Sequence, residues 1–201
     1  MNTSITLYGM GTSRSARCRW TLAELGLDYE YVEDRALFHS DKLRGMHPQG
    51  KMPAAVINGA PLFESAAICE HLCDVAGGNA LIGAAGSRAR ALHAQWVSFV
   101  LTELEAYLWS NAKHTSFYPE ERRVPAVIEA NEPEVQSALG VLNDALASTT
   151  FLVEDQFSVT DIIVSWTVNW ARRGDKLGPY PHLSRYLGRL FEREHCTLNP
   201  E

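Results

Sequence analysis

The spacing of the hydrophobic residues changes once along the chain, and this change limits the folds that the chain can adopt. Up to about residue 76, short apolar runs typical of β-strands alternate with segments of helical spacing. After about residue 87, apolar residues recur only at the three- and four-residue steps of amphipathic helices. The sequence therefore predicts an α+β domain over residues 1–77, a glycine-rich linker over 78–86 and an all-helical domain over 87–201.

The first domain is predicted to hold four strands in one sheet. The candidate strands are Ile5–Tyr8, Tyr29–Val32, Pro53–Ile57 and Pro61–Phe63, with a hairpin signal at Asn58-Gly59. Helices are predicted over Ser15–Leu25 and from Ser65 onward, and the polar stretch through His39, Lys42 and Arg44 is expected to be irregular. With one helix allowed in that stretch, the order is β-α-β-α-β-β-α, which suits a thioredoxin-like sheet covered by helices.

The second domain is predicted to be a helical bundle around one buried helix. Its candidate helices are Leu92–Leu108, Val127–Leu146, Val159–Trp170 and His182–Glu194. The segment Val159–Trp170 is apolar almost all round, which is typical of a buried central helix. Ser158 and Asp161 have the spacing of a capping box at its start.

Composition excludes several classes of partner. With 24 acidic and 18 basic residues, the net charge of -6 argues against nucleic acid as the main partner. No apolar run approaches the ~20 residues that a membrane helix needs, and no basic and apolar leader is present, so we expect a cytoplasmic protein without membrane contact. The four cysteines lack metal-binding spacing, so no metal site is predicted and all four are expected to be reduced (Cys18, Cys69, Cys73 and Cys196).

Four segments, in this order, carry a family resemblance. They are Leu7–Arg17, the His47-Pro48-Gln49-Gly50-Lys51-Met52-Pro53 run, Phe63–Ile68 with Glu64-Ser65 inside it, and Phe157–Ile162. Together they resemble the cytosolic glutathione transferases over nearly the whole chain. The second segment departs from the family pattern at His47, where the family usually has Asn.

The resemblance implies a glutathione site built around two of these segments. Ser65 is expected to cap the helix that follows it, and the free N–H groups of the first turn attract an anion. In the family this position holds the γ-glutamyl carboxylate, while the acidic side chain, here Glu64, helps to bind the amino group. Outside the family pattern, the same pair would be an ordinary helix cap beside a solvated glutamate.

The loop before the third strand is expected to hold the rest of the tripeptide. In the family the bond before Pro53 is cis, which leaves the backbone of Met52 able to pair with a peptide as an added strand would. Lys51 is placed to meet the glycyl carboxylate, with assistance from His39. The alternative is that Lys51 and His39 are solvated surface residues, and for His39 this alternative is favoured.

The family's reaction needs the thiolate of glutathione, because a free thiol with a pKa near ~8.5 is mostly protonated at neutral pH. The start of the first helix can favour the thiolate, and Ser13, with Thr12 close behind, is the candidate hydrogen-bond donor. Arg14 can add positive charge, and it stands where cysteine-type classes carry their thiol. Arg17 is expected to be structural. Ser13 and Thr12 would also be explained by helix capping alone.

The electrophile is expected to bind between the domains, against an aromatic group near the end of the long helix. The residues of this group are Tyr107, Trp109, His114, Phe117 and Tyr118. The same residues are equally compatible with a core or a dimer interface.

The predicted function is conjugation of glutathione, as co-substrate and without a cofactor, to small hydrophobic electrophiles. The alternatives are a glutathione-dependent isomerase of the zeta type, whose motif is only partly matched, and a binding protein without catalytic activity. The resemblance also implies a homodimer.

Overall fold

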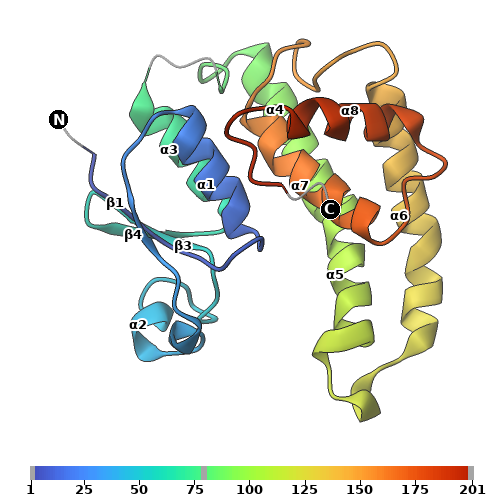
Figure 1. Ribbon diagram of the computed structural model, residues 1–201, viewed down its shortest axis with the longest axis horizontal. Helices are drawn as coiled ribbons and strands as arrows, with labels where there is room; N and C mark the ends of the chain where they lie inside the picture. The colour runs from blue at the N-terminus through green and yellow to red at the C-terminus, as the bar shows by residue number, and fades with distance from the viewer. Residues whose placement is uncertain (1–2, 78–80, 199–201) are drawn as a thin grey trace. The chain divides into compact units, whose positions relative to one another are not determined.

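A computed structural model of the protein describes residues 3–77 and 81–198 (Figure 1). The chain divides into two compact units, the first comprising Met1–Gly83 with Phe191–Glu201 and the second comprising Ala84–Leu190. The prediction of an α+β part followed by a helical part is confirmed. Residues 78–80 of the predicted linker lie outside the described residues.

The first unit is built on a mixed sheet of the strands β1 Ile5–Tyr8, β2 Glu30–Val32, β3 Ala54–Ile57 and β4 Ala60–Phe63, in the order β2-β1-β3-β4. β1 pairs in parallel with β2 and antiparallel with β3, and β3 pairs antiparallel with β4. Asn58 and Gly59 form the predicted hairpin turn, and their positive φ angles of 50° and 83° match the twist of the strands that they join.

Two helices cover one face of this sheet. α1 (Ser15–Glu24) supplies the crossover between the parallel strands β1 and β2, and α3 (Ser65–Ala76) lies beside it (Figure 1). Leu7 on β1, Trp20 on α1 and Leu72 on α3 are fully buried. The core of the first unit therefore lies between the two helices and the sheet.

The stretch between β2 and β3 is more regular than the sequence predicts. It contains a 3₁₀ turn, Arg35–Leu37, and the short helix α2, Asp41–Arg44. The hydroxyl of Ser40 caps α2 by accepting a hydrogen bond from the N–H of Leu43 at 3.2 Å. Leu43 is fully buried in a small cluster with Tyr8, so the prediction of an irregular stretch is wrong here because one cap and one apolar anchor suffice to fix a single turn.

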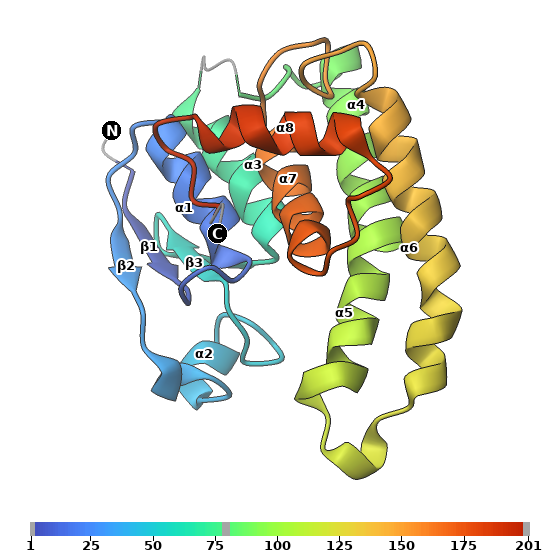
Figure 2. The ribbon, with the colours of Figure 1, turned by 45° about the vertical axis from the view of Figure 1, so that its right-hand side comes forward.

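The second unit is a bundle of long helices. Its helices are α4 Arg88–Phe99, α5 Ala106–Ala112, α6 Pro125–Ala145, α7 Val159–Arg173 and α8 Pro181–Phe191. α4 and α5 continue one another, and α6 runs beside α5 (Figure 2). Two π-helical segments, Val100–Glu105 and Lys113–Phe117, interrupt and extend the predicted helix Leu92–Leu108. In the described part of the chain, none of the helices has the length and apolar character needed to cross a bilayer.

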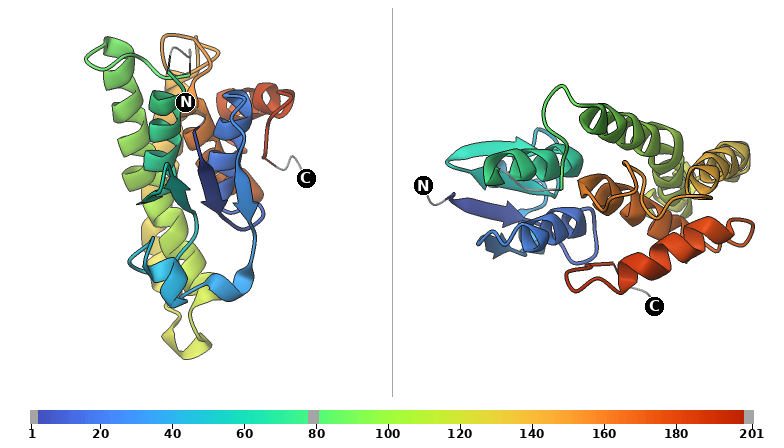
Figure 3. Two further views of the ribbon diagram at one scale, coloured as in Figure 1. Left: turned by 90° about the vertical axis from the view of Figure 1, so that its left-hand side faces the viewer. Right: turned by 90° about the horizontal axis from the view of Figure 1, so that it is seen from above.

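α7 is the buried central helix that the sequence predicts. Seen from above in Figure 3, it lies between α4 and α8. The predicted capping box is confirmed, because the backbone N–H of Ser158 donates to Oδ2 of Asp161 at 2.9 Å. The buried carboxylate of Asp161 also accepts hydrogen bonds from the N–H of Leu152 at 3.2 Å and the hydroxyl of Tyr186 at 2.9 Å. Burial nevertheless raises the pKa of Asp161 to about 6.

The segment after α8 packs on the first unit. The Arg193 guanidinium donates to both carboxylate oxygens of Glu24 on α1, at 2.9 and 2.8 Å. The hydroxyl of Thr197 donates to the carbonyl of Ala16 at 2.8 Å. Although the sequence assigns these residues to the helical domain, their hydrogen bonds fasten the end of the chain to α1.

Candidate active site

Strand register brings three of the motif segments to one end of the sheet. Tyr8, the last residue of β1, is paired with Ala54, the first residue of β3, and Ala54 is paired with Phe63, the last residue of β4. The loop before α1, the loop before Ala54 and the start of α3 therefore all leave the sheet at the same end. Three of the four segments that the sequence singles out are neighbours in this unit.

The start of α3 has an unusual backbone conformation and N–H groups that a ligand can use. Glu64 precedes the helix with a φ of 69°, and its carbonyl accepts the first helical hydrogen bond, from Ile68, at 2.9 Å. Within the described chain, the N–H groups of Ser65, Ala66 and Ala67 find no acceptor. Unpaired N–H groups at a helix start bind anions, since they carry the positive end of the helix dipole.

Ser65 does not cap α3, so this part of the prediction is wrong. Glu64 occupies the N-cap position, and Ser65 is already the first helical residue, from which its hydroxyl cannot reach the following N–H groups as a cap does. Its buried hydroxyl accepts a hydrogen bond from Nη1 of Arg17 at 3.2 Å instead. Arg17 is 1% exposed and links α1 to the start of α3, which agrees with the structural role expected for it.

The loop before β3 offers backbone groups for pairing. The Met52–Pro53 peptide bond is cis, as the resemblance implies, and the strand itself begins at Ala54. Neither the N–H nor the C=O of Met52 forms a hydrogen bond within the part of the chain that the structure describes. An extended peptide can therefore pair with Met52 as an added strand does. Lys51 is exposed beside it.

His39 stabilises the loop before β3 through two polar contacts. Its ring nitrogen Nδ1 lies 3.0 Å from the carbonyl of Gln49, and its backbone N–H donates to the carbonyl of Gly50 at 2.9 Å. A Cβ at position 50 would lie 2.7 Å from the Cα of His39, so glycine is required there. His39 thus holds the shape of the loop that carries Lys51 and Met52.

The loop between β1 and α1 positions two serine hydroxyls at the helix start. Oγ of Ser13 and Oγ of Ser15 lie 2.6 Å apart, and Ser15 also accepts a hydrogen bond from the N–H of Met10 at 2.9 Å. Ser15 is fully buried, Ser13 is half-buried and Thr12 is exposed. A Cβ on Gly9 would lie 2.6 Å from the Cβ of Ser15, so only glycine allows this approach.

The structure does not favour the alternative that Ser13 or Thr12 is simply a helix cap. Arg14, not Ser13 or Thr12, occupies the N-cap position of α1, and it makes no side-chain cap. The hydroxyl of Ser13 accepts from the N–H of Ser15 only at 3.4 Å. The predicted site does not include Ser15. The Ser-x-Ser spacing of Ser13 and Ser15 is the sequence feature that indicates it.

The thiol of Cys18 is poorly suited to act here. Cys18 on α1 is fully buried, and its Sγ lies 3.8 Å from the carbonyl of Ser65. Burial, and a hydrogen bond with Cys69, raise the pKa of the Cys18 thiol well above its usual value. Among residues 3–77 and 81–198, no cluster of His, Cys, Asp or Glu is arranged to hold a metal ion.

The predicted aromatic group of the helical unit forms two separate contacts. The Trp109 ring packs on Phe117, with centroids 4.8 Å apart, and lies 6.5 Å from Trp170 of α7. The His114 ring packs edge-on against Tyr118 at 5.2 Å, and its Nδ1 accepts from the backbone N–H of Val124 at 3.1 Å. Tyr107 is half-buried.

Comparison with known proteins agrees with this geometry. Residues 3–74 match the family model described as "Glutathione S-transferase, N-terminal domain", and residues 125–189 match "Glutathione S-transferase, C-terminal domain". Glutathione transferase GST 23 of Zea mays is 32% identical over 83% of this chain and 72% of its own length. Disulfide-bond oxidoreductase YfcG of Escherichia coli is 29% identical over 94% of this chain and 91% of its own.

A solved structure shows the same fold over almost the whole chain. It is the glutathione transferase URE2P6 from Phanerochaete chrysosporium in complex with oxidized glutathione. Its TM-score is 0.85 at 22% identity, with coverage of 97% of this chain and 93% of that one. Both family models match this chain, and its fold is a mixed sheet followed by a helical bundle. The chain therefore belongs to the glutathione S-transferase family.

Proposed function

We propose that this protein binds glutathione in its first unit and transfers the glutathione thiolate to small hydrophobic electrophiles. The observation that carries the proposal is the meeting of the α1 start, the Met52 backbone and the α3 start at one end of the sheet. These three places supply a thiolate-stabilising site, a strand-like pairing edge and an anion site. A tripeptide with a carboxylate at each end matches that combination.

Each part of glutathione has a proposed partner. The γ-glutamyl carboxylate receives the unpaired N–H groups at the start of α3, and Glu64 accepts from the α-amino group. The cysteinyl backbone pairs with the N–H and C=O of Met52. The glycyl carboxylate meets the ammonium group of Lys51, and His39 acts by holding the loop.

Ser13 is the proposed donor to the thiolate. If Ser15 accepts from Met10 and donates to Ser13, the hydroxyl proton of Ser13 is directed away from Ser15 and is available to a sulfur. The N-terminal end of α1 adds a positive potential, and both effects lower the pKa of a bound thiol. Ser15 is in this proposal a positioning residue.

The electrophile is proposed to contact the helical unit through the predicted aromatic side chains. They are Tyr107, Trp109, His114 and Tyr118. Aromatic walls favour apolar, ring-containing electrophiles. The proposal includes a cytoplasmic homodimer, whose mass can be measured by light scattering on an eluting peak.

Calorimetry with reduced glutathione tests the binding step. Ser65→Ala removes a hydroxyl beside the anion site and is expected to weaken binding about tenfold. Ser4→Ala, an exposed serine at the start of the sheet, is the matched control and should leave affinity unchanged. The absence of any heat of association with the wild-type protein would overturn the proposal. Turnover of a chlorinated nitrobenzene then tests transfer.

Similarity to YfcG favours thiol–disulfide exchange as a second candidate. The same glutathione thiolate would attack a disulfide sulfur and form a mixed disulfide, releasing the other sulfur as a thiol. Rates with a small organic disulfide and with the chlorinated nitrobenzene, measured on one preparation, decide between the two reactions.

A further inference from the structure

Tyr31 of β2 carries a buried hydroxyl group close to the start of α1. It is paired with Leu7 of β1, the strand that leads into the loop before this helix. A Cβ on Gly9 would lie 2.8 Å from Cε2 of Tyr31 and 2.9 Å from Oγ of Ser15. The tyrosine ring and the serine hydroxyl therefore approach the same point beside Gly9, which has no side chain to separate them.

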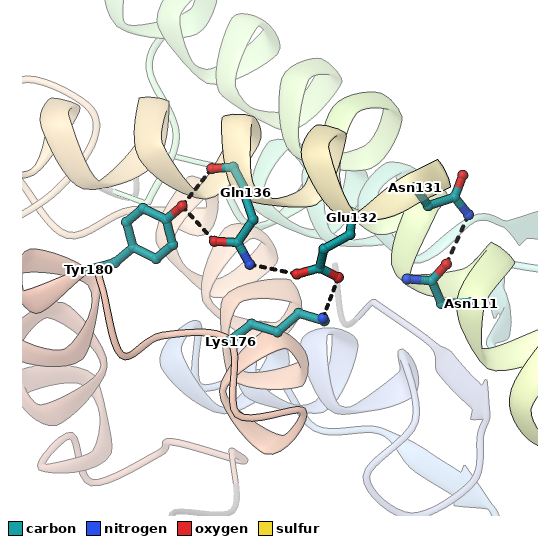
Figure 4. Close-up of polar contacts among 6 residues, drawn as sticks. All are labelled: Asn111, Asn131, Glu132, Gln136, Lys176 and Tyr180. Atoms are coloured by element: carbon teal, nitrogen blue, oxygen red, sulfur yellow. Dashed lines mark hydrogen bonds and ion pairs between the residues drawn. The ribbon is translucent and has the colours of Figure 1, made fainter. Parts of the chain in front are cut away.

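The hydroxyl of Tyr31 forms no hydrogen bond of ordinary geometry with any described residue. Two tyrosines of the helical unit show the usual arrangement. Tyr180 donates to Oε1 of Gln136 at 2.8 Å (Figure 4), and Tyr186 donates to Asp161 at 2.9 Å. Because a buried donor without an acceptor is costly, the Tyr31 hydroxyl needs an acceptor close by.

Ser15 offers this acceptor. Burial raises the pKa of the Tyr31 phenol, while the charge of Arg19 and the hydroxyl of Ser15 act in the opposite direction. The carboxylate of Glu33 also acts on the phenol, but Glu33 is exposed and its Oε1 accepts from the N–H of Gly11 at 2.8 Å. Ser15, in contrast, is buried together with the phenol oxygen.

Arg19 holds the tyrosine ring in this place. Its guanidinium carbon lies 5.3 Å from the centroid of the Tyr31 ring, and its Nη2 donates to the carbonyl of Gly11 at 2.9 Å. A cation beside an aromatic ring attracts the ring electrostatically. One side chain of α1 therefore fastens both Tyr31 and the loop before the helix.

The hydrogen bonds of Ser15 can be counted. A serine oxygen accepts two hydrogen bonds and donates one. The N–H of Met10 takes one acceptor position at 2.9 Å, and the second is open either to Tyr31 or to Ser13, whose Oγ lies 2.6 Å away. If Ser13 took the second position, the Ser15 proton would turn to the carbonyl of Met10 at 3.4 Å. The proton of Ser13 would then be used up.

We propose that Tyr31 is a positioning residue, which donates to the second acceptor position of Ser15 and thereby makes Ser13 the acceptor of the Ser15 proton. With both acceptor positions filled, the short contact between the two serines has only one direction. The proton of Ser13 then points to the thiolate of bound glutathione. This inference rests on the proposed function and adds to it a residue from another strand.

Removal of a single oxygen atom tests this role. Tyr31→Phe keeps the ring beside Arg19 and should raise the pKa of the bound glutathione thiol by about 0.5, because Ser13 then donates to Ser15 in part of the molecules. The dissociation constant of glutathione should change less than about twofold. Ultraviolet absorbance of the thiolate against pH measures the pKa, and calorimetry measures the dissociation constant. Tyr29→Phe, at the half-buried tyrosine before β2, is the matched control and should leave both unchanged.

A double-mutant cycle shows whether Tyr31 acts through Ser15. In a Ser15→Ala background, Tyr31→Phe should change the pKa of the bound thiol by less than about 0.2, because the group that it positions is already gone. A shift of equal size in both backgrounds overturns the inference, as does an unchanged pKa in Tyr31→Phe alone.

A measurement without glutathione separates this inference from the proposed function. NMR of the tyrosine-labelled protein detects the hydroxyl proton of Tyr31, which burial protects from exchange, and Tyr31→Phe assigns the signal. Ser15→Ala should accelerate the exchange of this proton about tenfold, whereas Glu33→Gln should leave it unchanged. An effect of Glu33→Gln in place of Ser15→Ala overturns the inference. Failure of the wild type to bind glutathione would overturn the proposed function, and the exchange rates would still decide whether Tyr31 donates to Ser15.

Discussion

Ser13 and Ser15 share a short hydrogen bond, with their hydroxyl oxygens 2.6 Å apart at the start of α1. Ser15 is buried and already accepts from the backbone of Met10 at 2.9 Å, whereas Ser13 is half-buried. A buried hydroxyl that receives one hydrogen bond and gives another fixes the direction of its neighbour's proton. Either hydroxyl can be the donor at this distance, and we propose that Ser15 donates to Ser13 and so orients the Ser13 proton.

Replacing Ser13 should impair the chemical step more than it impairs the binding of glutathione. Ser13→Ala is expected to raise the pKa of the bound glutathione thiol by about 1 to 2, because a hydrogen bond to the thiolate is lost. For the same reason kcat/KM should fall about 10- to 100-fold. Ultraviolet absorbance of the thiolate against pH measures the pKa of the bound thiol, and turnover of a chlorinated nitrobenzene measures kcat/KM. Ser15→Ala should shift the same pKa less. Thr12→Ala is the control, and our choice of donor is wrong if Thr12→Ala abolishes turnover while Ser13→Ala preserves it.

Lys51 should recognise only the glycyl end of glutathione. Lys51→Met is expected to weaken glutathione binding about tenfold, because a charge-assisted hydrogen bond to the carboxylate is lost. Glutathione esterified at the glycyl carboxylate lacks that negative charge, so its affinity should be nearly the same for both proteins. Calorimetry with the two ligands on the two proteins forms a double-mutant cycle. Equal losses for both ligands would place Lys51 outside the site.

The buried carboxylate of Asp161 should make stability fall as pH rises through the acid range. Its folded pKa is raised to about 6 from a usual 3.8, so between these values the folded state holds a proton that the unfolded state has released. Its contribution is therefore fully present below about pH 3.8 and is lost as pH rises through about 6, by about 3 kcal/mol in total.

Urea unfolding of the wild type and of Asp161→Asn between these pH values isolates this effect. The variant has no proton to release at this position, so the difference between the two stability curves should change by about 3 kcal/mol across the range. Tyr186→Phe removes one hydrogen bond to the carboxylate and should move the transition to higher pH. A difference that is independent of pH would contradict the assignment.

Gly50 should be less tolerant of a side chain than another glycine with the same backbone angle. Gly50 has a φ of 60° and Gly26 a φ of 62°, but a Cβ would meet the His39 backbone only at position 50. Gly50→Ala is therefore expected to be about 2 kcal/mol more destabilising than Gly26→Ala, because the added methyl group overlaps the backbone of His39. Thermal unfolding of the two variants measures the difference. Similar losses would show that the loop can move aside.

Local patterns carried most of what could be predicted from the sequence. The hairpin turn at Asn58-Gly59, the capping box of Ser158 and Asp161, and the buried α7 all depend on residues within a few positions of one another. Propensity and spacing act over the same short range, so these elements could be predicted.

Contacts between distant segments could not be predicted. The hydrogen bond from Arg17 to Ser65 spans 48 residues, and it exists only because α1 and α3 pack side by side. The π-helical segments were also missed, since their apolar spacing differs too little from that of an α-helix. The direction of the Ser13 and Ser15 hydroxyls depends on the fold of the loop, which no spacing rule supplies.

The return of the chain to α1 has a consequence for synthesis on the ribosome. Arg193 and Thr197 are translated 169 and 181 residues after Glu24 and Ala16, to which they are hydrogen-bonded. A nascent chain can form the sheet and helices of the first unit early, but the hydrogen bonds to Glu24 and Ala16 of α1 form only after Arg193 and Thr197 have left the exit tunnel.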